Sequence, residues 1–263
     1  MNELGLNRIT PSMLSQYDGC PKLFYYSSWL GIKLPQPVIH FKFGTAIHNA
    51  IGLMYTTHSL NKAIESFQNE FTIDCVDAEL YKTEAERVAK YGDMLHDGTL
   101  MLQEFSNNIE IFTNLYNIKP IQFELAWKEV LTNPETLDKP LEVPLSCRID
   151  CIAENHTIVE YKTSAKEYDI FETRASPQAL SYAWIYLQKY KVIPTIHYIV
   201  LIKKRKTNKI QHLKINYDMA DLLMFDSKVR SIIENIKNRQ FEKPLKGHPF
   251  FCECGKYEKA LTY

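Results

Sequence analysis

Residues 146–164 have the sequence SCRIDCIAENHTIVEYKTS, and this stretch decides the fold. Apolar residues dominate both halves, and the polar run ENH separates them, which predicts two β-strands joined by a short loop. Asp150 interrupts the first strand, and Glu160 and Lys162 lie near the end of the second. Because alternate residues of a strand face the same side, Glu160 and Lys162 project together. Charged groups in so apolar a setting need partners or a metal ion to offset the cost of burying them.

The length of the loop between these strands fixes which residues stand opposite each other. A two-residue turn at Asn155–His156 would set Asp150 opposite Tyr161, on the wrong face. A three-residue loop, Glu154–His156, sets Asp150 opposite Glu160 and brings both carboxylates and the lysine to one face. We therefore predict the three-residue loop, with one of its last two residues in the left-handed backbone conformation that Asn and His tolerate.

Two carboxylates and a lysine on neighbouring strands suit the hydrolysis of a phosphodiester. The carboxylates can hold one or two divalent cations, and the lysine can orient water or stabilise the charge that develops in the transition state. The alternative is a surface hairpin that carries an ordinary aspartate and a Glu–Lys pair. The spacing alone is short and degenerate, so it leaves both interpretations open.

The period of the apolar residues divides the chain into a helical part and a mixed part. Helices are predicted over residues 10–28, 44–55, 59–71, 78–116 (one long helix, or two with an interruption near Gly98), 176–190 and 219–238. Strands are predicted over residues 121–130, 141–153, 157–163, 197–205 and 209–215. We expect one domain of mixed α/β (α+β) class, with a helical N-terminal part (1–115), a core (116–240) and a cysteine-bearing tail (241–263).

Composition narrows the class of protein. Hydrophobic residues make up 45% and charged residues 24%, as in ordinary globular proteins. Lys plus Arg equals Asp plus Glu at 31 each, which excludes a strongly basic coat-like nucleic-acid binder but allows a local basic groove. The start of the chain lacks the apolar core of a signal peptide, and no apolar run is long enough to span a bilayer. We expect a soluble, cytoplasmic protein with no membrane partner.

In its acidic hairpin and in the order of its motifs, the chain resembles the PD-(D/E)xK nucleases, and within them the RecB-like branch. That branch includes nuclease modules of recombination helicases, CRISPR-associated RecB-like exonucleases and stand-alone phage nucleases. The resemblance rests on Asp150, the run Glu160-Tyr161-Lys162 and the segment Gln178–Tyr182. Further motifs follow in the family's order and extend the resemblance over nearly the whole chain: Ser12–Tyr17 with Cys20-Pro21, Gly44–His48, Glu124 and a C-terminal cysteine group.

The resemblance implies a restriction-endonuclease-like core with a helical N-terminal extension. It implies a divalent-metal-dependent DNA exonuclease that serves DNA repair, recombination or phage DNA processing, with DNA and a helicase or recombination protein as partners. The catalytic residues it implies are Asp150, Glu160 and Lys162. The metal ligands it implies are His48, Asp150, Glu160 and Tyr161. Such a set suits Mg²⁺ or Mn²⁺, and the imidazole favours manganese.

The remaining site residues each have a structural alternative. Gly44 and Gly52 flank His48 on one helix face, where small residues let another element approach closely, but a lone histidine also packs in helix interfaces. Gln178 and Tyr182, four residues apart on a helix, line the active site and contact DNA in the family; they would otherwise be half-exposed residues of an amphipathic helix. Arg148, two residues before Asp150 on the same face, is a candidate phosphate contact.

The cysteines depart from the family pattern. Cluster-bearing members of the branch hold a 4Fe–4S cluster with one N-terminal and three C-terminal cysteines. Here Cys20 matches the first, but the tail offers only Cys252 and Cys254. The resemblance implies that these thiols converge, and His248 is the nearest candidate for a fourth ligand. Because the set is one cysteine short of a cubane, we expect an iron–sulfur or zinc site to be incomplete or absent.

A rival function comes from a different class of protein. The chain could be a non-catalytic DNA-binding or assembly protein that kept the nuclease fold and partners a helicase or recombinase. The presence of Asp150, Glu160 and Lys162 argues against it, since the loss of any one would be the simplest sign of a dead site. A small-molecule metallohydrolase is a third interpretation, which the basic residues around the site do not favour.

Overall fold

The computed structural model describes residues 5–34, 39–203, 209–242 and 252–261. Its centre is a five-stranded sheet with the order β1-β2-β3-β4-β5. The strands are Pro120–Glu129, Leu145–Ala153, Thr157–Ser164, Thr195–Ile202 and Lys209–Asn216. β3 and β4 run parallel, and the other neighbouring pairs are antiparallel. This mixed sheet confirms the predicted α/β class and the predicted hairpin of the last two strands.

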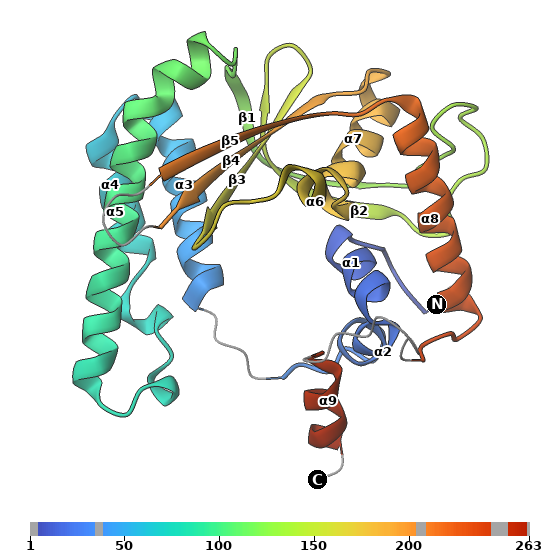
Figure 1. Ribbon diagram of the computed structural model, residues 1–263, viewed down its shortest axis with the longest axis horizontal. Helices are drawn as coiled ribbons and strands as arrows, with labels where there is room; N and C mark the ends of the chain where they lie inside the picture. The colour runs from blue at the N-terminus through green and yellow to red at the C-terminus, as the bar shows by residue number, and fades with distance from the viewer. Residues whose placement is uncertain (1–4, 35–38, 204–208, 243–251, 262–263) are drawn as a thin grey trace.

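Helices cover both faces of the sheet (Figure 1). One face carries α3 (Ile39–Thr57), α4 (Leu60–Glu70) and α5 (Glu84–Asn114). The other carries α7 (Pro177–Tyr190) and α8 (Met219–Lys237), with α1 (Pro11–Gly19) packed beside them. The shorter helical segments are α2 (Pro21–Phe24), η1 (Tyr25–Trp29), η2 (Ile73–Cys75), η3 (Ala78–Leu80), α6 (Ile170–Arg174) and α9 (Cys254–Leu261).

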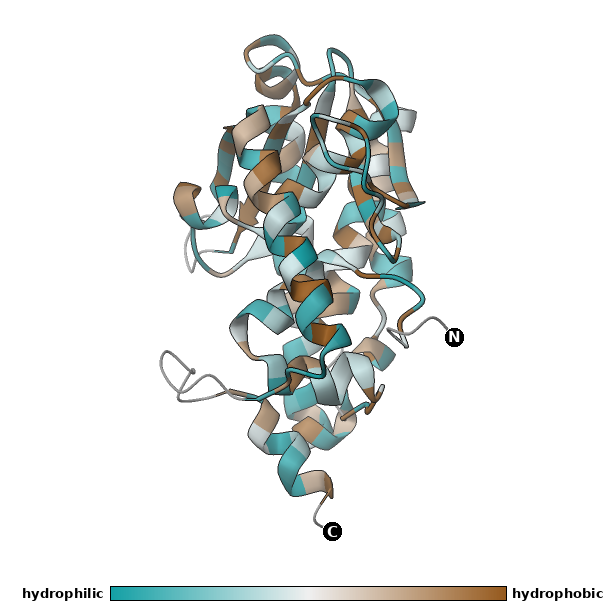
Figure 2. Ribbon diagram, turned by 90° about the vertical axis from the view of Figure 1, so that its right-hand side faces the viewer, coloured by the Kyte–Doolittle hydropathy of each residue, from teal (hydrophilic) through white to brown (hydrophobic). Residues whose placement is uncertain are grey.

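The sheet separates two hydrophobic cores. Along β4, Ile196 and Tyr198 pack toward α7 and α8, whereas Ile199 and Leu201 pack toward α3 and α5. Both faces of this strand are therefore buried, as expected for a central strand next to a parallel neighbour. Hydrophobic and hydrophilic residues are interspersed along the surrounding helices (Figure 2), and the buried hydrophobic residues of these helices pack into the two cores.

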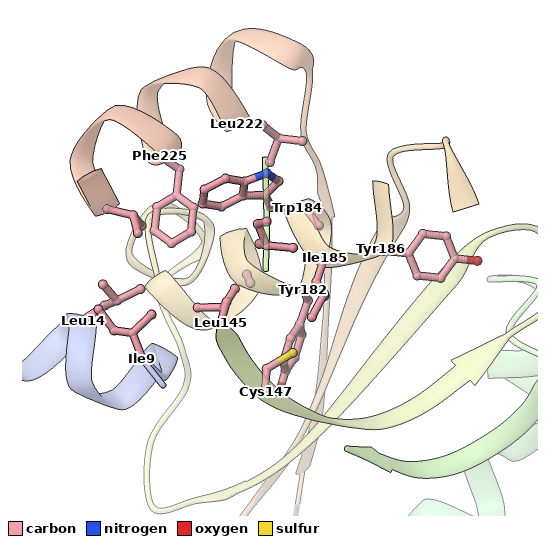
Figure 3. Packing of buried hydrophobic residues seen from close by; sticks show 14 of the residues in the cluster. Ile9, Leu14, Leu145, Cys147, Tyr182, Trp184, Ile185, Tyr186, Leu222 and Phe225 are labelled. Atoms are coloured by element: carbon pink, nitrogen blue, oxygen red, sulfur yellow. The ribbon is translucent and has the colours of Figure 1, made fainter. Parts of the chain in front are cut away.

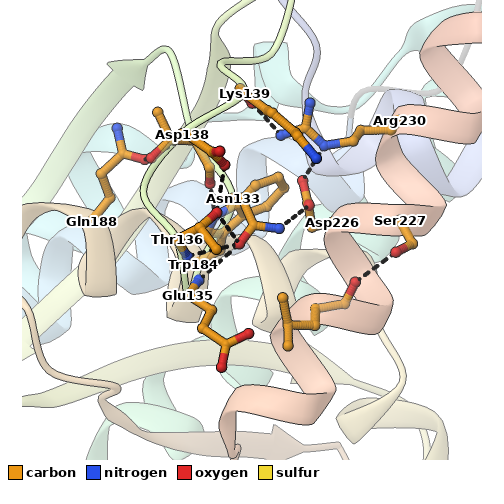
Figure 4. Close-up of polar contacts among 12 residues, drawn as sticks. Asn133, Glu135, Thr136, Asp138, Lys139, Trp184, Gln188, Asp226, Ser227 and Arg230 are labelled. Carbon is orange, nitrogen blue, oxygen red and sulfur yellow. Dashed lines mark hydrogen bonds and ion pairs between the residues drawn. The ribbon is translucent and has the colours of Figure 1, made fainter.

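Trp184 is the largest side chain that is fully buried, and it joins α7 to α8 (Figure 3). Its ring lies edge-on to Phe225, with the ring centroids 6.0 Å apart, and its Nε1 donates a hydrogen bond to the Thr132 carbonyl over 3.0 Å. The loop that contains Thr132 connects β1 to β2. It is also tied to α8, where Asp226 accepts hydrogen bonds from Asn133 Nδ2 and Arg230 Nε (Figure 4). These contacts fix the entry into β2.

Most predicted helices are confirmed, and their caps explain where they begin. Thr10, Ser59 and Ser176 each accept a hydrogen bond from the backbone of the first turn of α1, α4 and α7. The predicted helix over 10–28 is divided at Cys20, which ends α1 and caps α2. The helix α9 in the tail was not predicted. The predicted end of the fourth strand at residue 205 lies outside the described residues.

Of the two alternatives for residues 78–116, the interruption near Gly98 is wrong, because the single long helix α5 is continuous through it. A Cβ atom at Gly98 would lie 2.2 Å from Cζ of Phe67, so the glycine makes room for the Phe67 ring of α4. Glycine costs about 1 kcal/mol relative to alanine inside a helix, and here the close packing of α4 on α5 offsets that cost.

The loop between β2 and β3 has the predicted three-residue length. The paired residues are Cys151–Val159, Ile152–Ile158 and Ala153–Thr157, which is the register that the shared face of the carboxylates required. Asn155 and His156 both adopt the left-handed conformation, with φ of 55° and 53°. The sequence predicted this conformation for one of the two residues, whereas both adopt it.

The predicted alternation of the first strand is wrong in one respect. Phe123 packs toward α3 and α5, whereas Leu125 and Trp127 pack toward α7 and α8, although residues two apart should share a face. The residue between them, Glu124, has a φ of 54°, in the left-handed region. The backbone is therefore distorted at Glu124, and the two sides of the strand exchange faces there.

Candidate active site

A cleft of about 810 Å³ opens at one end of β2 and β3. One wall is the first half of α3, which contributes His40, Phe41 and His48. The opposite wall is the segment that leads into α1 and the first turns of that helix, including Arg8. The floor carries Glu124, Arg148, Asp150, Glu160 and Lys162, and α7 adds Gln178 and Tyr182. The elements that surround the cleft can be followed in Figure 1.

His48, Glu124 and Asp150 form a cluster of candidate metal ligands in this cleft. One nitrogen or oxygen atom from each residue lies within 4.8 Å of the corresponding atoms of the other two. His48 Nδ1 is 3.5 Å from Asp150 Oδ2. The three side chains come from α3, β1 and β2, so the tertiary fold is needed to assemble them.

The local backbone explains why these three side chains meet. Glu124 of β1 has a left-handed backbone and lies next to Asp150 of the neighbouring strand β2. The pairs Phe123–Cys151 and Leu125–Ile149 flank this position on either side. In both strands the side chains before and after this point lie on opposite faces of the sheet. Cys151 and Phe123 pack in the core under α3 and α5, whereas Ile149 and Leu125 pack in the core under α7 and α8. On α3, Gly44 and Gly52 face Thr163 and Phe123, and a Cβ there would lie 3.6 and 3.5 Å from these side chains. These are ordinary van der Waals distances, so α3 packs against β1 and β3 at both glycines but neither position requires glycine.

Asp150 is buried and is held in place by main-chain hydrogen bonding. Its Oδ2 accepts a hydrogen bond from the backbone N–H of Tyr161 over 2.9 Å. Backbone pairing between β2 and β3 ends at Cys151–Val159. Beyond that pair, the Asp150 side chain accepts the hydrogen bond from the Tyr161 N–H in place of a backbone carbonyl of β2. Burial alone would raise the pKa of Asp150. The hydrogen bond and charge of His48, together with Lys162, outweigh burial and hold that pKa below its ordinary value.

Glu160 has an exposed side-chain fraction of only 2% and is surrounded by hydrogen-bond donors. Its Oε1 is 2.5 Å from Lys162 Nζ and accepts from Gln178 Nε2 over 2.8 Å. Its Oε2 lies 3.0 Å from the Tyr182 hydroxyl. Burial, reinforced by the charge of Asp150, raises the pKa of Glu160 to about 7 despite the opposing charge of Lys162.

The surroundings of the two basic groups of the site favour their charged forms. Burial lowers the pKa of His48, but the hydrogen bond that its ring donates to Asp150 and the charge of that carboxylate reverse this, and the net pKa is raised. Burial likewise lowers the pKa of Lys162, and the charge of Glu160 raises it above its ordinary value. The cleft therefore places buried carboxyl groups beside basic side chains, and the attraction between them offsets part of the cost of burial.

The structure brings most of the predicted site residues into this one cleft. Gln178 and Tyr182 lie side by side on α7, and both contact Glu160. Arg148 lies at the cleft, but its Nε is 3.2 Å from Glu124 Oε2, so a carboxylate already engages it. Tyr161 differs from the others, because its ring packs against Phe105 in the core under α3 and α5 and does not line the cleft.

Glu124 is a candidate metal ligand that the sequence alone does not identify. The family resemblance marks it only as an acidic residue ahead of the aspartate strand. In the structure Glu124, and not Glu160, joins His48 and Asp150 in the group whose candidate ligand atoms all lie within 4.8 Å of one another. A charged residue amid the alternating apolar residues of a strand was the available signal. Burial and the charge of Asp150 raise the pKa of Glu124, and Arg148 opposes this rise.

Cys20, Cys252 and Cys254 form a second group, the three-thiol cluster. Their sulfur atoms lie within 4.8 Å of one another, although Cys20 is more than 230 positions away from the other two in sequence. Cys20 lies between α1 and α2, Cys254 begins α9, and Cys252 lies two residues before it. Tyr26 of η1 stacks on Tyr257 of α9 in the same buried cluster, with the ring centroids 5.8 Å apart. Burial raises the pKa of Cys254 to about 12. His248, the candidate fourth ligand, lies outside the described residues.

The profile of the PD-(D/E)XK nuclease superfamily matches residues 8–256 of the sequence. The chain belongs to this superfamily. A crystal structure of a protein from Eubacterium rectale, described as a "Putative exonuclease", superimposes with a TM-score of 0.57 at 12% identity, covering 95% of this chain and 88% of that one. At that identity the likeness shows the fold alone, and it confirms the predicted restriction-endonuclease-like core with a helical N-terminal part.

The crystal structure of SSO0001 has a TM-score of 0.36 at 15% identity, over 91% of this chain and 80% of that one, which is too low to carry an argument. No curated protein sequence matches the chain. Within the described residues, no helix is both long and apolar enough to cross a membrane.

Membership in the superfamily implies hydrolysis of nucleic-acid phosphodiester bonds with divalent metal ions. The residues of the cleft fit such an ion. An imidazole and two carboxylates within 4.8 Å of one another form a mostly oxygen-donating set, and Mg²⁺ and Mn²⁺ prefer such ligands.

Proposed function

We propose that the protein is a divalent-metal-dependent DNA nuclease that removes nucleotides from DNA ends. The observation that carries this proposal is the convergence of His48, Glu124 and Asp150, with Lys162 beside them, in one cleft. When bound there, a divalent cation would polarise the phosphate and lower the pKa of a water molecule. Mg²⁺ or Mn²⁺ suits the ligands, and the imidazole of His48 favours Mn²⁺.

The residues of the cleft divide the remaining tasks. Asp150, fixed by the Tyr161 N–H, and His48 are the proposed metal ligands, together with Glu124. The Lys162 ammonium, on the cleft side of Glu160, would stabilise negative charge that develops on the phosphate. Glu160 is the further ligand that the family resemblance implies. Its oxygens contact Lys162 and two side chains of α7, Gln178 and Tyr182.

Gln178 and Tyr182 have a positioning role in this proposal. The Tyr182 hydroxyl lies 2.5 Å from the Arg148 carbonyl and 3.0 Å from Glu160 Oε2, and it accepts a hydrogen bond from Gln178 Nε2. The pair therefore ties Glu160 to the backbone of β2. Both residues also line the cleft, where they can contact DNA near the scissile phosphate, and Arg148 would reach a neighbouring phosphate from the rim.

We assign the chain to the RecB-like branch because its motifs follow that branch's order, from the Cys20 helix to the cysteine tail. The family match over residues 8–256 supports a single nuclease domain. The description of the Eubacterium rectale protein as an exonuclease candidate supports an end-directed activity. DNA repair, recombination or phage DNA processing, with a helicase or recombination protein as partner, is the setting we propose. The three-thiol cluster would be an incomplete iron–sulfur or zinc site.

One assay tests this function. The protein is incubated with end-labelled linear DNA and with covalently closed circular DNA, each in Mn²⁺, in Mg²⁺ and in EDTA. We expect shortening of the linear DNA with either metal, no reaction in EDTA, and an intact circle. Cutting of the circle would show an endonuclease. Binding of the linear DNA without any cleavage would favour the rival function, a non-catalytic partner of a helicase or recombinase.

A further inference from the structure

Phe41 is an exposed aromatic residue on the wall of the cleft. Its side chain is 73% exposed, although the cleft is otherwise lined mainly by polar and charged groups. It belongs to neither hydrophobic core, and within the described residues no aromatic ring or cation contacts it. A phenyl ring of this exposure is unfavourable in water, so a ligand that covers it would gain free energy.

The position of Phe41 on α3 relates it directly to the proposed metal site. Phe41 precedes His48 by seven residues (48 − 41), which is two helical turns, so both side chains lie on the cleft side of the helix. Seven residues span about 10 Å along a helix axis, at 1.5 Å each. Stacked nucleotides of one strand are about 3.4 Å apart, so this distance corresponds to at most about three nucleotides.

The opposite wall carries groups suited to the backbone of a nucleic-acid strand. Arg8 is exposed, lines the cleft, and forms no ion pair within the described residues. Ser12 and Ser15 in α1 also line this wall. A guanidinium and hydroxyl groups contact phosphate well, whereas a phenyl ring offers its face to a base. One wall of the cleft therefore suits the phosphates of a DNA strand, and the other wall suits a base of the same strand.

We propose that Phe41 is a base-stacking residue that positions the DNA strand two or three nucleotides from the scissile phosphate. This inference rests on the proposed nuclease function and assigns a strand-positioning residue to the same site. Stacking needs the face of a base, which Watson–Crick stacks already cover, so the base on Phe41 must be unpaired or at a frayed end. Phe41 would then set the position of the bond to be cut without touching the reacting atoms.

The test is a scan of single abasic sites through an end-labelled single-stranded oligonucleotide. Digestion by the wild type in Mn²⁺ is expected to pause at one fixed offset, two or three nucleotides from each abasic site. Base–aromatic stacking is worth about 5- to 150-fold in affinity, so cleavage at that offset should slow by a similar factor. Phe41→Ala should lose this pause and raise KM for the intact oligonucleotide, whereas Phe41→Trp should keep both.

Phe171→Ala is the matched control, because Phe171 is 77% exposed but lies on α6, at a separate pocket away from the cleft. Digestion by Phe171→Ala should pause at the same offset as digestion by the wild type. An unchanged pause in Phe41→Ala, or a wild type without any fixed offset, would overturn the inference.

A second measurement separates this inference from the nuclease proposal. Oligonucleotides with 2-aminopurine at single positions are bound in EDTA, where no cleavage occurs. The wild type should quench the probe at one position, and Phe41→Ala should not. A wild type that cleaves no DNA would refute the nuclease proposal, yet quenching that depends on Phe41 would still support the stacking role. Equal quenching by both proteins would refute it.

Discussion

Glu160 makes the metal-free protein sensitive to pH in a way that the structure predicts. Its carboxyl group has a pKa of about 7 in the folded protein, because burial and the charge of Asp150 disfavour ionisation, against 4.5 in an exposed carboxyl. Since the folded-state pKa is the higher one, the stability from this group is fully present below about pH 4.5. It is lost as the pH rises through about 7.

The size of the loss follows from the two values. The difference is about 2.5 units (7 − 4.5), and each unit corresponds to 1.36 kcal/mol, so raising the pH from 4.5 to above 7 should cost about 3 kcal/mol. For a chain of this length 1 kcal/mol shifts Tm by about 2–4 °C, so Tm should fall by about 6–12 °C. His48, whose pKa is raised, adds a loss of the same sign above pH 6.5. Asp150, whose pKa is lowered, acts only below pH 3.8.

The measurement is thermal unfolding in EDTA at pH 5.0 and 8.5 for the wild type, Glu160→Gln and the surface control Glu154→Gln. Glu160→Gln should show a much smaller fall in Tm, with only the His48 part left, whereas Glu154→Gln should behave as the wild type. Saturating Mn²⁺ should raise the wild-type Tm more at pH 8.5, since metal binding requires ionised carboxylates. A wild-type Tm that is flat between these pH values, or equal slopes in wild type and Glu160→Gln, would refute the reasoning.

Further predictions concern packing, metal choice and the thiols. Gly98→Ala should destabilise the protein by about 1–3 kcal/mol because its Cβ would overlap the buried Phe67 ring, whereas Gly92→Ala on the same helix meets no atom within 4 Å and should be neutral or stabilising in urea unfolding. His48→Ala should reduce Mn²⁺-supported cleavage more than Mg²⁺-supported cleavage, since imidazole is the softest proposed ligand; equal losses in the two metals would indicate a structural histidine. Protein purified in air should be colourless, contain less than stoichiometric iron and remain active with Mn²⁺, because the three-thiol cluster lacks a fourth cysteine. A brown protein that holds a full cubane on anaerobic iron and sulfide analysis would contradict this.

The sequence was sufficient for the parts of the fold that depend on local pattern. The three-residue loop followed from the requirement that Asp150 and Glu160 share a face, and the helix starts followed from capping residues such as Thr10 and Ser176. The convergence of the three cysteines came from the family resemblance alone, because spacing of more than 230 residues carries no information about contact.

The failures all concern contacts between distant segments. Gly98 looked like a helix break because its partner, the Phe67 ring, lies on another helix. Glu124 was not assigned to the metal site because its left-handed backbone, which turns it toward Asp150, breaks the alternation on which strand prediction depends. Phe41 gave no signal as a cleft residue, since an apolar residue near a helix start is normally assigned to the core.

The most direct test of the central claim is the single-turnover rate of DNA cleavage in Mn²⁺ for Asp150→Ala and Lys162→Ala. Lys166→Ala, an exposed lysine four residues further along, is the control. Circular dichroism of each variant shows whether it is folded. We predict that both site variants remain folded and lose at least about 10²–10³-fold in rate, because each removes a group that acts on the transition state, while Lys166→Ala cleaves as the wild type does. Wild-type rates in a folded Asp150→Ala or Lys162→Ala protein would contradict the account.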